Sequence, residues 1–276
     1  MIPGITWLAS YPKSGNTWLR VFLDNWFGNR AEAVDINSLR GGECSPNSRE
    51  RFESATLLEP DDLLPEEIEP LRLPVMRLLA SETPGSPLVK VHNAYTPAFG
   101  SSTARAAIYI VRDPRDVVPS LAAHFGIGIH EAVEFVNGRS VLGQTGQRWH
   151  RQLPQMLEDW SGHAHSWLDR CDVPLHVVRY EDLPGAFVGV LRFLGEDAED
   201  TARLTTAIAH SRLEELQRQE SEKGFKERLN ATPFFRKGKA GAWREVLTPN
   251  QAARIERAHG ETMARFGYEA ACAARA

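Results

Sequence analysis

The chain has 276 residues, 42% of them hydrophobic, which is enough to bury a large core. Its formal charge of -4 gives no support to general nucleic-acid binding, which favours basic domains. The three cysteines are scattered without metal-ligand spacing and suggest a reducing compartment. No apolar run approaches the roughly 20 residues that cross a bilayer, and the first predicted strand leaves no room for a signal peptide. We therefore expect a cytoplasmic protein with no membrane span.

Four apolar runs predict buried strands, at residues 5–10, 87–92, 106–111 and 174–179. Helical patterns lie at residues 17–27, 66–80, 114–124, 130–137, 154–170, 200–209 and 248–266. Residues 41–86 are the least regular part, and residues 138–150 are expected to form a mobile loop. Apolar strands with polar residues at their carboxyl ends are typical of a parallel sheet covered on both faces. Ligands of such sheets bind beyond those ends. Without a repeat or a linker, we expect one α/β domain over residues 1–276.

The segment from Tyr11 to Trp18 joins the first predicted strand to the first helix. The N–H groups and the dipole at a helix start, together with Lys13, favour a phosphate-type anion. The order differs from a Walker A loop because Lys13 precedes Gly15 and no lysine precedes Thr17. The segment therefore predicts a phosphate-like site that is not that of an ordinary kinase. The plainer alternative is a polar helix cap with a lysine facing solvent.

A second segment, Arg112 to Ser120, follows the strand at 106–111. Arginine offers a bidentate fork to a phosphate, and the serine adds a donor. Helix-capping rules place Asp113 at the cap and Pro114 in the first turn, with Arg115 solvated. They leave Arg112 unexplained. A rival interpretation makes Asp113 a magnesium ligand, although its usual partner loop is missing.

Two further segments indicate a binding site only in combination with the first two. Arg236 to Trp243 combines cations with two glycines, which permits close backbone approach to an anion, yet such a loop alone is usually just solvated. Lys90 and His92 end the strand at 87–92 and point to the same face. A lone histidine there would ordinarily be a strand-end residue bonded to backbone. The remaining histidines without such context are expected at the surface or on the acceptor side: His124, His130, His150, His163 and His165.

Together, these segments resemble the sulfotransferases that use 3′-phosphoadenosine 5′-phosphosulfate (PAPS). The match covers Tyr11 to Trp18, Lys90 to His92, Arg112 to Ser120 and Arg236 to Trp243, in that order. Tyr180 to Leu183 adds a fifth stretch. The matches span residues 7–243, and the alanine- and arginine-rich composition suggests a bacterial member. The resemblance implies a central parallel sheet flanked by helices, with a P-loop-like phosphosulfate loop.

The resemblance also implies a role for each matching residue. The 5′-phosphosulfate would be bound by Lys13, Ser14, Gly15, Asn16, Thr17 and Trp18. The 3′-phosphate would be bound by Arg112, Ser120, Arg236, Lys237 and Gly238, and the adenine by Trp18, Tyr180 and Ser211. His92 would be the general base, because an imidazole can take a proton from a hydroxyl at neutral pH. Lys13 and Lys90 would be electrostatic catalysts. No metal is implied, and the product is adenosine 3′,5′-bisphosphate.

The expected reaction is in-line transfer of a sulfuryl group to the hydroxyl of a small molecule. A partly apolar acceptor cavity is expected around Phe52, Tyr95, Phe99, Phe125, Phe135 and Trp149. It suits a phenol, a lipid or a natural product better than a highly anionic polysaccharide, and a sugar hydroxyl stays an alternative acceptor. Asn16 replaces a common threonine, Ala242 stands where many members carry aspartate, and the family's dimer motif is not reproduced, which leaves a homodimer open. Two alternatives remain: a magnesium-dependent small-molecule kinase and a non-catalytic nucleotide-binding module.

Overall fold

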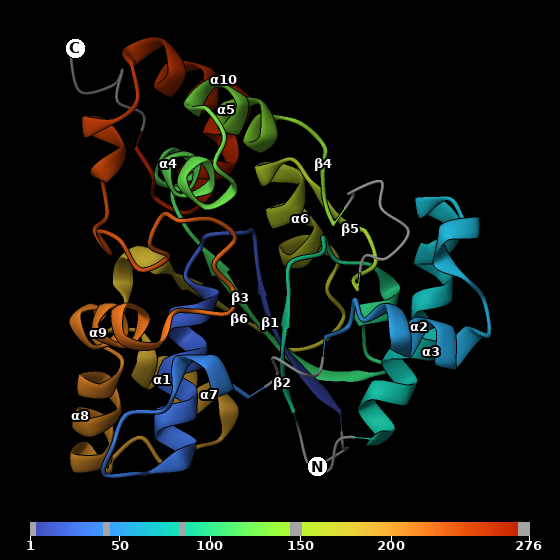
Figure 1. Cartoon of the computed structure of the whole chain (residues 1–276), viewed down its shortest axis with the longest axis horizontal. Coiled ribbons are helices and arrows are strands. Elements are labelled where there is room, and N and C mark those ends of the chain that lie inside the picture. Colours follow the sequence, from blue (N-terminus) through green and yellow to red (C-terminus); the bar gives the residue numbers. More distant parts are fainter. Residues whose placement is uncertain (1–3, 41–44, 83–86, 144–150, 270–276) are drawn as a thin grey trace. The chain divides into compact units, whose positions relative to one another are not determined.

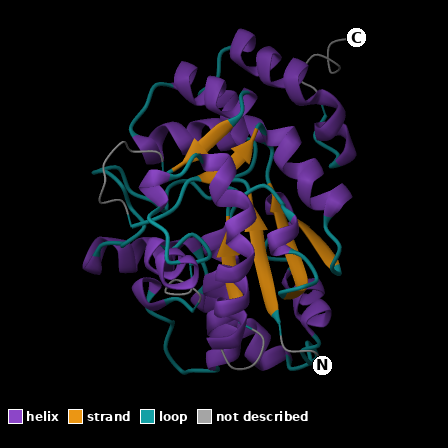
Figure 2. Cartoon of the chain, turned by 90° about the vertical axis from the view of Figure 1, so that its right-hand side faces the viewer, coloured by secondary structure: helices purple, strands orange, loops and turns teal. Residues whose placement is uncertain are grey.

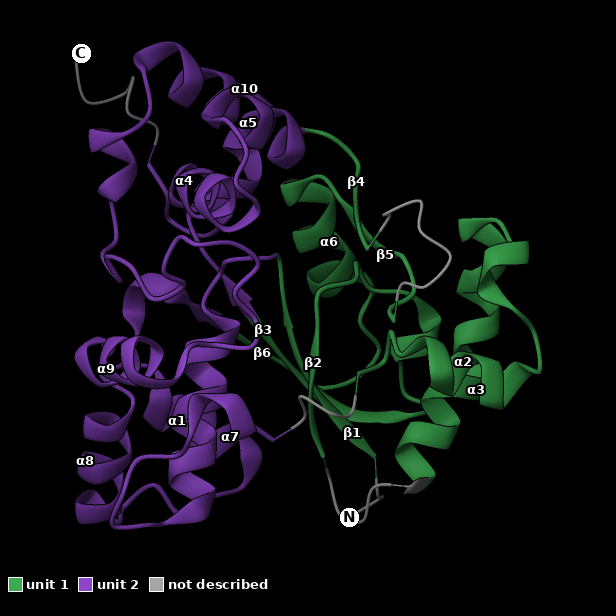
Figure 3. Ribbon diagram, in the orientation of Figure 1, with its two compact units in different colours: residues 1–11, 41–109, 138–177 green, residues 12–40, 110–137, 178–276 purple. Residues whose placement is uncertain are grey.

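The computed structural model describes residues 4–40, 45–82, 87–143 and 151–269. Contacts divide the chain into two compact units, each built from three stretches of sequence (Figure 3). The first unit holds residues 1–11, 41–109 and 138–177, and the second holds residues 12–40, 110–137 and 178–276. The single domain expected over residues 1–276 stays a prediction. Within the described ranges, no helix has the length and apolar character needed to cross a bilayer.

A four-stranded sheet has the strand order β2-β1-β3-β6 (Figure 1). Its strands are β1 (Ile5–Ser10), β2 (Leu88–Val91), β3 (Ala104–Val111) and β6 (Leu175–Arg179). β1 and β2 run parallel, with Thr6 opposite Leu88 and Ala9 opposite Val91. All six residues of β1 are buried, as a continuous apolar strand in a covered sheet requires. The four predicted strands and the α/β fold with a central parallel sheet are confirmed.

The first unit adds the helices α2 (Arg49–Thr56), α3 (Pro65–Glu82) and α6 (Trp160–Arg170), and the strand pair β4 (Ser140–Leu142) and β5 (Gln155–Glu158). α2 packs on α3, and α6 packs on β5. The helix predicted over 154–170 is wrong before Trp160, where α6 begins, because residues 155–158 form β5. Glu158 has a φ of 59°, which interrupts the helical path, and Asp159 caps α6 by accepting the Gly162 N–H at 2.6 Å. The loop expected at 138–150 contains β4, and residues 144–150 lie outside the described ranges.

The second unit is mostly helical. Figure 2 colours the helices of the chain purple and the strands orange. Its helices are α1 (Asn16–Gly28), α4 (Pro114–Phe125), α5 (Ile129–Asn137), α7 (Phe187–Leu194), α8 (Thr201–His210), α9 (Leu213–Lys223) and α10 (Pro249–Arg265). α1 packs on α8, and α4 packs on α5 and α10. Leu19, Phe22, Leu23 and Trp26 of α1 are buried, and Phe22 stacks on Phe187 of α7 at a ring separation of 3.8 Å. This packing fixes the start of α1, where the candidate site lies.

Candidate active site

The loop between β1 and α1 has the backbone form of an anion cradle. Lys13 has a φ of 65° and Gly15 a φ of 101°, so the chain turns sharply before α1 begins at Asn16. The first turn of α1 carries no acidic residue that would oppose an anion at the helix start. The side chains of Ser14, Asn16 and Thr17 are buried. The loop thus presents the positive end of a 13-residue helix together with polar side chains.

Gly15 is a glycine for two reasons. Its φ lies in the left-handed region, and a Cβ built on it would lie 2.6 Å from Cδ2 of Tyr180. The Tyr180 ring therefore packs directly on the loop backbone. Any larger residue at this position would push the ring or the loop out of place.

We expect Gly15→Ala to weaken binding of adenosine 3′,5′-bisphosphate by at least about 10-fold, because a displaced cradle loses charged hydrogen bonds of roughly 1.5–3 kcal/mol. Gly195→Ala is the matched control. Gly195 also has a positive φ, of 82°, but its added Cβ would meet nothing within 4 Å. Both variants place a side chain at a positive φ, but only Gly15→Ala also creates a steric clash. Titration calorimetry on both variants therefore separates the effect of the clash from that of backbone strain. Equal affinities in the two variants would contradict the assignment.

Arg112 links the polar ends of three strands. It follows β3, donates from a guanidinium nitrogen to the Lys13 carbonyl at 3.1 Å, and lies over the Tyr180 ring at 4.2 Å. Lys13 follows β1, and Tyr180 follows β6. The residues after these three strands are therefore brought together, as the sheet pattern predicts.

Two buried polar atoms of this cluster have no hydrogen-bond partner among the residues that the structure describes. They are Oγ of Ser14 and Nε of Arg112. Leaving a buried donor unpaired costs roughly 1–3 kcal/mol, and more for a charged group. Phosphate or sulfate oxygens would satisfy each donor, Ser14 in the loop expected to bind the 5′-phosphosulfate and Arg112 in the segment expected to bind the 3′-phosphate. Both segments thus fit the bound anions that the sequence predicts.

The Lys13 side chain lies against an aromatic ring that sequence reasoning did not single out. Its Nζ is 3.3 Å from the ring centroid of Phe234, a cation–π contact. The backbone N–H groups of Phe234 and Phe235 donate to the carboxylate of Glu220, at 2.7 and 2.9 Å. The only signal in the sequence is the Phe-Phe pair directly before Arg236.

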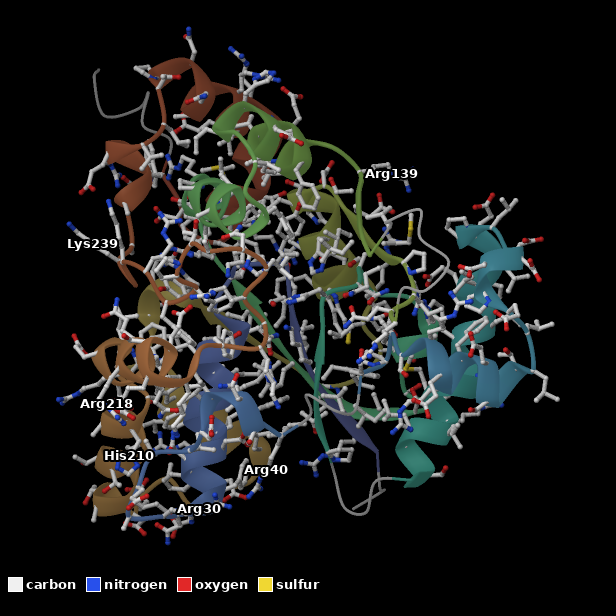
Figure 4. The ribbon with its side chains drawn as sticks, viewed as in Figure 1. Arg30, Arg40, Arg139, His210, Arg218 and Lys239 are labelled. Carbon is white, nitrogen blue, oxygen red and sulfur yellow. The ribbon has the colours of Figure 1, made fainter. Side chains whose placement is uncertain are left out.

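The basic segment after Phe235 meets the helix that carries Ser120. Arg236 donates to the carbonyl of Pro119 at 3.0 Å, which brings it beside Ser120 on α4. Gly238 has a φ of 58°, and a Cβ on it would lie 2.7 Å from Leu213. Lys237 is exposed and pairs with Glu245 at 2.6 Å. Figure 4 shows Lys239 of the same segment pointing outward.

Asp116 anchors this basic segment. One carboxylate oxygen accepts the Gly241 N–H at 2.6 Å, and the other accepts the Trp243 N–H at 2.8 Å. The two donors flank Ala242, so α4 supplies a carboxylate anchor at this point of the segment. Burial raises the pKa of Asp116, while the two backbone donors oppose that rise.

We expect Asp116→Asn to weaken binding of the bisphosphate about 10-fold, because the amide can accept only one of the two N–H groups and carries no charge. The segment from Arg236 to Trp243 would then lose part of its anchor on α4. Glu214→Gln, an exposed change on α9, is the control. If calorimetry gives wild-type affinity for Asp116→Asn, the Asp116 carboxylate is not needed to position the basic segment for binding.

The start of α4 confirms part of the helix-cap interpretation and corrects the rest. Asp113 caps the helix by accepting the Arg115 N–H at 2.9 Å, and Pro114 begins it. Arg115, expected to be solvated, is 2% exposed and pairs with Asp113 and Glu256. The Asp113 carboxylate is thus engaged by an arginine. No group of three or more metal-ligating side chains occurs in the described part of the chain.

The three residues expected at the adenine lie together. Trp18 donates its indole N–H to the carbonyl of Ser211 at 2.8 Å and meets the Tyr180 ring edge-on at 5.7 Å. The Ser211 hydroxyl donates to the carbonyl of Ala207 within α8. Ser211 therefore fixes the indole through its backbone, and its hydroxyl is already engaged.

Within the first unit, His92 is held by the end of β1. Its Nδ1 lies 2.8 Å from the Ser10 carbonyl oxygen. Because a carbonyl can only accept, this contact assigns the proton to Nδ1, and Nε2 of the neutral ring is the basic nitrogen. Lys90 and His92 are both half-buried, whereas Val89 and Val91 are buried, so the lysine and histidine share a face as predicted.

His163, expected at the surface or on the acceptor side, is fully buried and therefore not at the surface. It lies in α6, where helical spacing turns it toward the core, and burial lowers its pKa to about 4. His130 and His165 are exposed, as expected.

Of the expected acceptor-cavity aromatics, Phe52 and Phe99 are fully buried core residues. His150 and Trp149 lie outside the described ranges.

The buried, neutral His163 predicts a loss of stability in acid. Its pKa is lowered from 6.5 to about 4, so below pH 6.5 the unfolded chain takes up a proton that the folded chain refuses. Between pH 7 and pH 5 this group should lower the free energy of unfolding by about 2 kcal/mol. Urea unfolding at both pH values measures it. His163→Gln, which does not titrate, should show a correspondingly smaller difference, and an equal difference in both proteins would contradict the assignment.

Comparison with known proteins gives a consistent result. A family model described as a sulfotransferase domain matches residues 3–267. Cytosolic sulfotransferase 16 of Arabidopsis thaliana is 26% identical, with 90% of this chain and 73% of that protein covered. Sulfotransferase 1B1 of Mus musculus is 24% identical, with 95% and 83% covered.

Solved structures share the fold. Retinol dehydratase in complex with androsterone and the inactive cofactor PAP superimposes with a TM-score of 0.61 at 20% identity, covering 95% of this chain and 81% of that one. Mouse sulfotransferase SULT7A1 complexed with PAP has a TM-score of 0.59 at 18% identity, covering 95% and 86%.

Proposed function

Because the chain belongs to the sulfotransferase family and is a PAPS-dependent transferase, we propose that it sulfates a hydroxyl group of a small molecule, with His92 as the general base. The observation that carries the proposal is the cradle of the second unit. Among the described residues, Ser14 Oγ in this loop and Arg112 Nε in the segment after β3 are buried donors without a hydrogen-bond partner. An anion is the ligand that satisfies such donors.

PAPS supplies the sulfuryl group, and the chain's residues bind and polarise it. We assign the 5′-phosphosulfate to the loop from Lys13 to Trp18. The 3′-phosphate is assigned to Arg112, Ser120 and the segment from Arg236 to Gly238. The contact of Arg236 with the Ser120 turn supports this second assignment. A nucleotide with a 3′-phosphate uses both groups of cations, whereas ATP lacks the anion for the second group.

In the proposed reaction, His92 accepts the hydroxyl proton at Nε2 as the hydroxyl oxygen forms a bond to sulfur. The bond between sulfur and the bridging oxygen breaks, and Lys13 neutralises the charge that collects on that oxygen. Lys90 stabilises the sulfuryl group in transfer. The contact between His92 Nδ1 and the Ser10 carbonyl supports the choice of Nε2 as the base.

For the acceptor we propose a phenol, a lipid or an aromatic natural product. Two structural neighbours were solved with androsterone and with retinol, which are apolar alcohols. The Arabidopsis relatives are cytosolic sulfotransferases, which supports a cytoplasmic location.

The test is a transfer assay with ³⁵S-labelled PAPS, without metal, against panels of phenols, hydroxylated lipids and sugars. Transfer to members of the first two panels is expected. Sulfation of sugars alone would overturn the acceptor class. Phosphorylation of any acceptor from ATP and magnesium, without transfer from PAPS, would overturn the reaction in favour of a kinase.

A further inference from the structure

The backbone around the base is held by one face of α6. His163 Nε2 lies 3.0 Å from the carbonyl oxygen of His92, and one turn later the Trp167 indole N–H donates to the carbonyl of Asn93 at 3.0 Å. On the same face, the Ser166 hydroxyl accepts the N–H of Tyr95 at 2.8 Å. Spacings of three and four residues put these side chains on one side of the helix. Three backbone groups after β2 are therefore held by α6, namely the carbonyls of His92 and Asn93 and the N–H of Tyr95.

His163 has one possible hydrogen arrangement in these contacts. The His92 carbonyl can only accept, so Nε2 of His163 carries the proton. Its Nδ1 then accepts from the Tyr109 hydroxyl, whose oxygen lies 3.0 Å away. The ring is further confined by Tyr11, which meets it edge-on at 5.4 Å. Tyr109, Tyr11 and His163 are all buried, so water does not compete for these bonds.

We propose that His163 is a positioning residue for sulfuryl transfer. Its Nε2–H, oriented by the Tyr109 hydroxyl, holds the His92 carbonyl, while the Ser10 carbonyl holds the His92 ring. The base is thus fixed through both its backbone and its side chain. This inference rests on the proposed role of His92 as the base.

The first test compares two substitutions of similar length. His163→Met removes the donor to the His92 carbonyl, whereas His163→Gln keeps an N–H₂ at a comparable reach. We expect His163→Met to lower the kcat of transfer about 10-fold with the KM for PAPS within about twofold, since small displacements of a catalytic group mainly reduce rate. His163→Gln should recover most of the loss. His165→Gln, an exposed change on the same helix, is the control and should keep wild-type kcat.

A second test asks whether the effect passes through His92. In a His92→Ala background, adding His163→Met should cause no further loss of residual transfer, because a residue that acts through the base has nothing left to position. If His163→Met does not fold, as judged by thermal unfolding, Tyr109→Phe replaces it and should lower kcat about threefold.

The outcomes separate the two claims. Three results would overturn the positioning role alone. The first is wild-type kcat in His163→Met, and the second is a kcat of His163→Gln as low as that of His163→Met. The third is an equal fold-loss of transfer from His163→Met with and without His92. Wild-type turnover in His92→Ala would overturn the base, and the positioning role with it.

Discussion

His92→Ala is expected to lower the kcat of sulfuryl transfer by roughly 10²- to 10⁴-fold, the usual contribution of a general base. The contact of Nδ1 with the Ser10 carbonyl leaves Nε2 as the proton acceptor, and alanine offers none. Binding of adenosine 3′,5′-bisphosphate should stay within about twofold, because the assigned phosphate contacts come from other residues. Steady-state assays with labelled PAPS and calorimetry measure the two quantities.

The matched control is His165→Ala, which removes an exposed histidine paired with Asp169. It should leave both turnover and affinity unchanged. If His92→Ala turns over at the wild-type rate, another group takes the proton. If it loses bisphosphate affinity together with turnover, His92 belongs to donor binding and not to proton transfer.

Lys13→Met is expected to lower kcat by roughly 10²- to 10³-fold, the range found when one preorganised donor to developing charge is removed. Methionine keeps the length of the side chain and must adopt the same backbone φ of 65°, so the substitution removes mainly the charge. The bisphosphate has no sulfuryl group, and its affinity should fall much less than kcat.

Lys226→Met, an exposed lysine of the same unit, is the control for general loss of positive charge. It should behave as the wild type. Equal losses of kcat and of bisphosphate affinity in Lys13→Met would show uniform binding rather than stabilisation of the transition state, and would remove Lys13 from the catalytic group.

The sheet and the family were predictable because local patterns carry them. β1 and β3 are largely apolar runs, and polar motifs follow both of them directly. The family model over residues 3–267 confirms the resemblance drawn from five short segments. Helix α9 was not predicted, because its sequence is mostly charged and its place is fixed by distant contacts. Gln219, for example, accepts the N–H of Ile36.

The side-chain environment of the site was less predictable. Phe234 meets Lys13 from more than two hundred residues away in the chain, and Asp116 reaches Gly241 across 125 residues. No local pattern marks such pairs. The burial of His163 likewise depends on contacts with Tyr11, His92 and Tyr109, which lie more than fifty residues away in the chain.

Calorimetry without metal measures whether two separate groups of cations bind the two phosphate groups of the PAPS product. Adenosine 3′,5′-bisphosphate is titrated beside ATP and AMP. We expect tight binding of the bisphosphate, at least about 100-fold tighter than AMP, since the 3′-phosphate adds two charged hydrogen bonds of roughly 1.5 kcal/mol each. Tighter binding of ATP than of the bisphosphate, appearing only when magnesium is added, would contradict the PAPS site and favour a kinase.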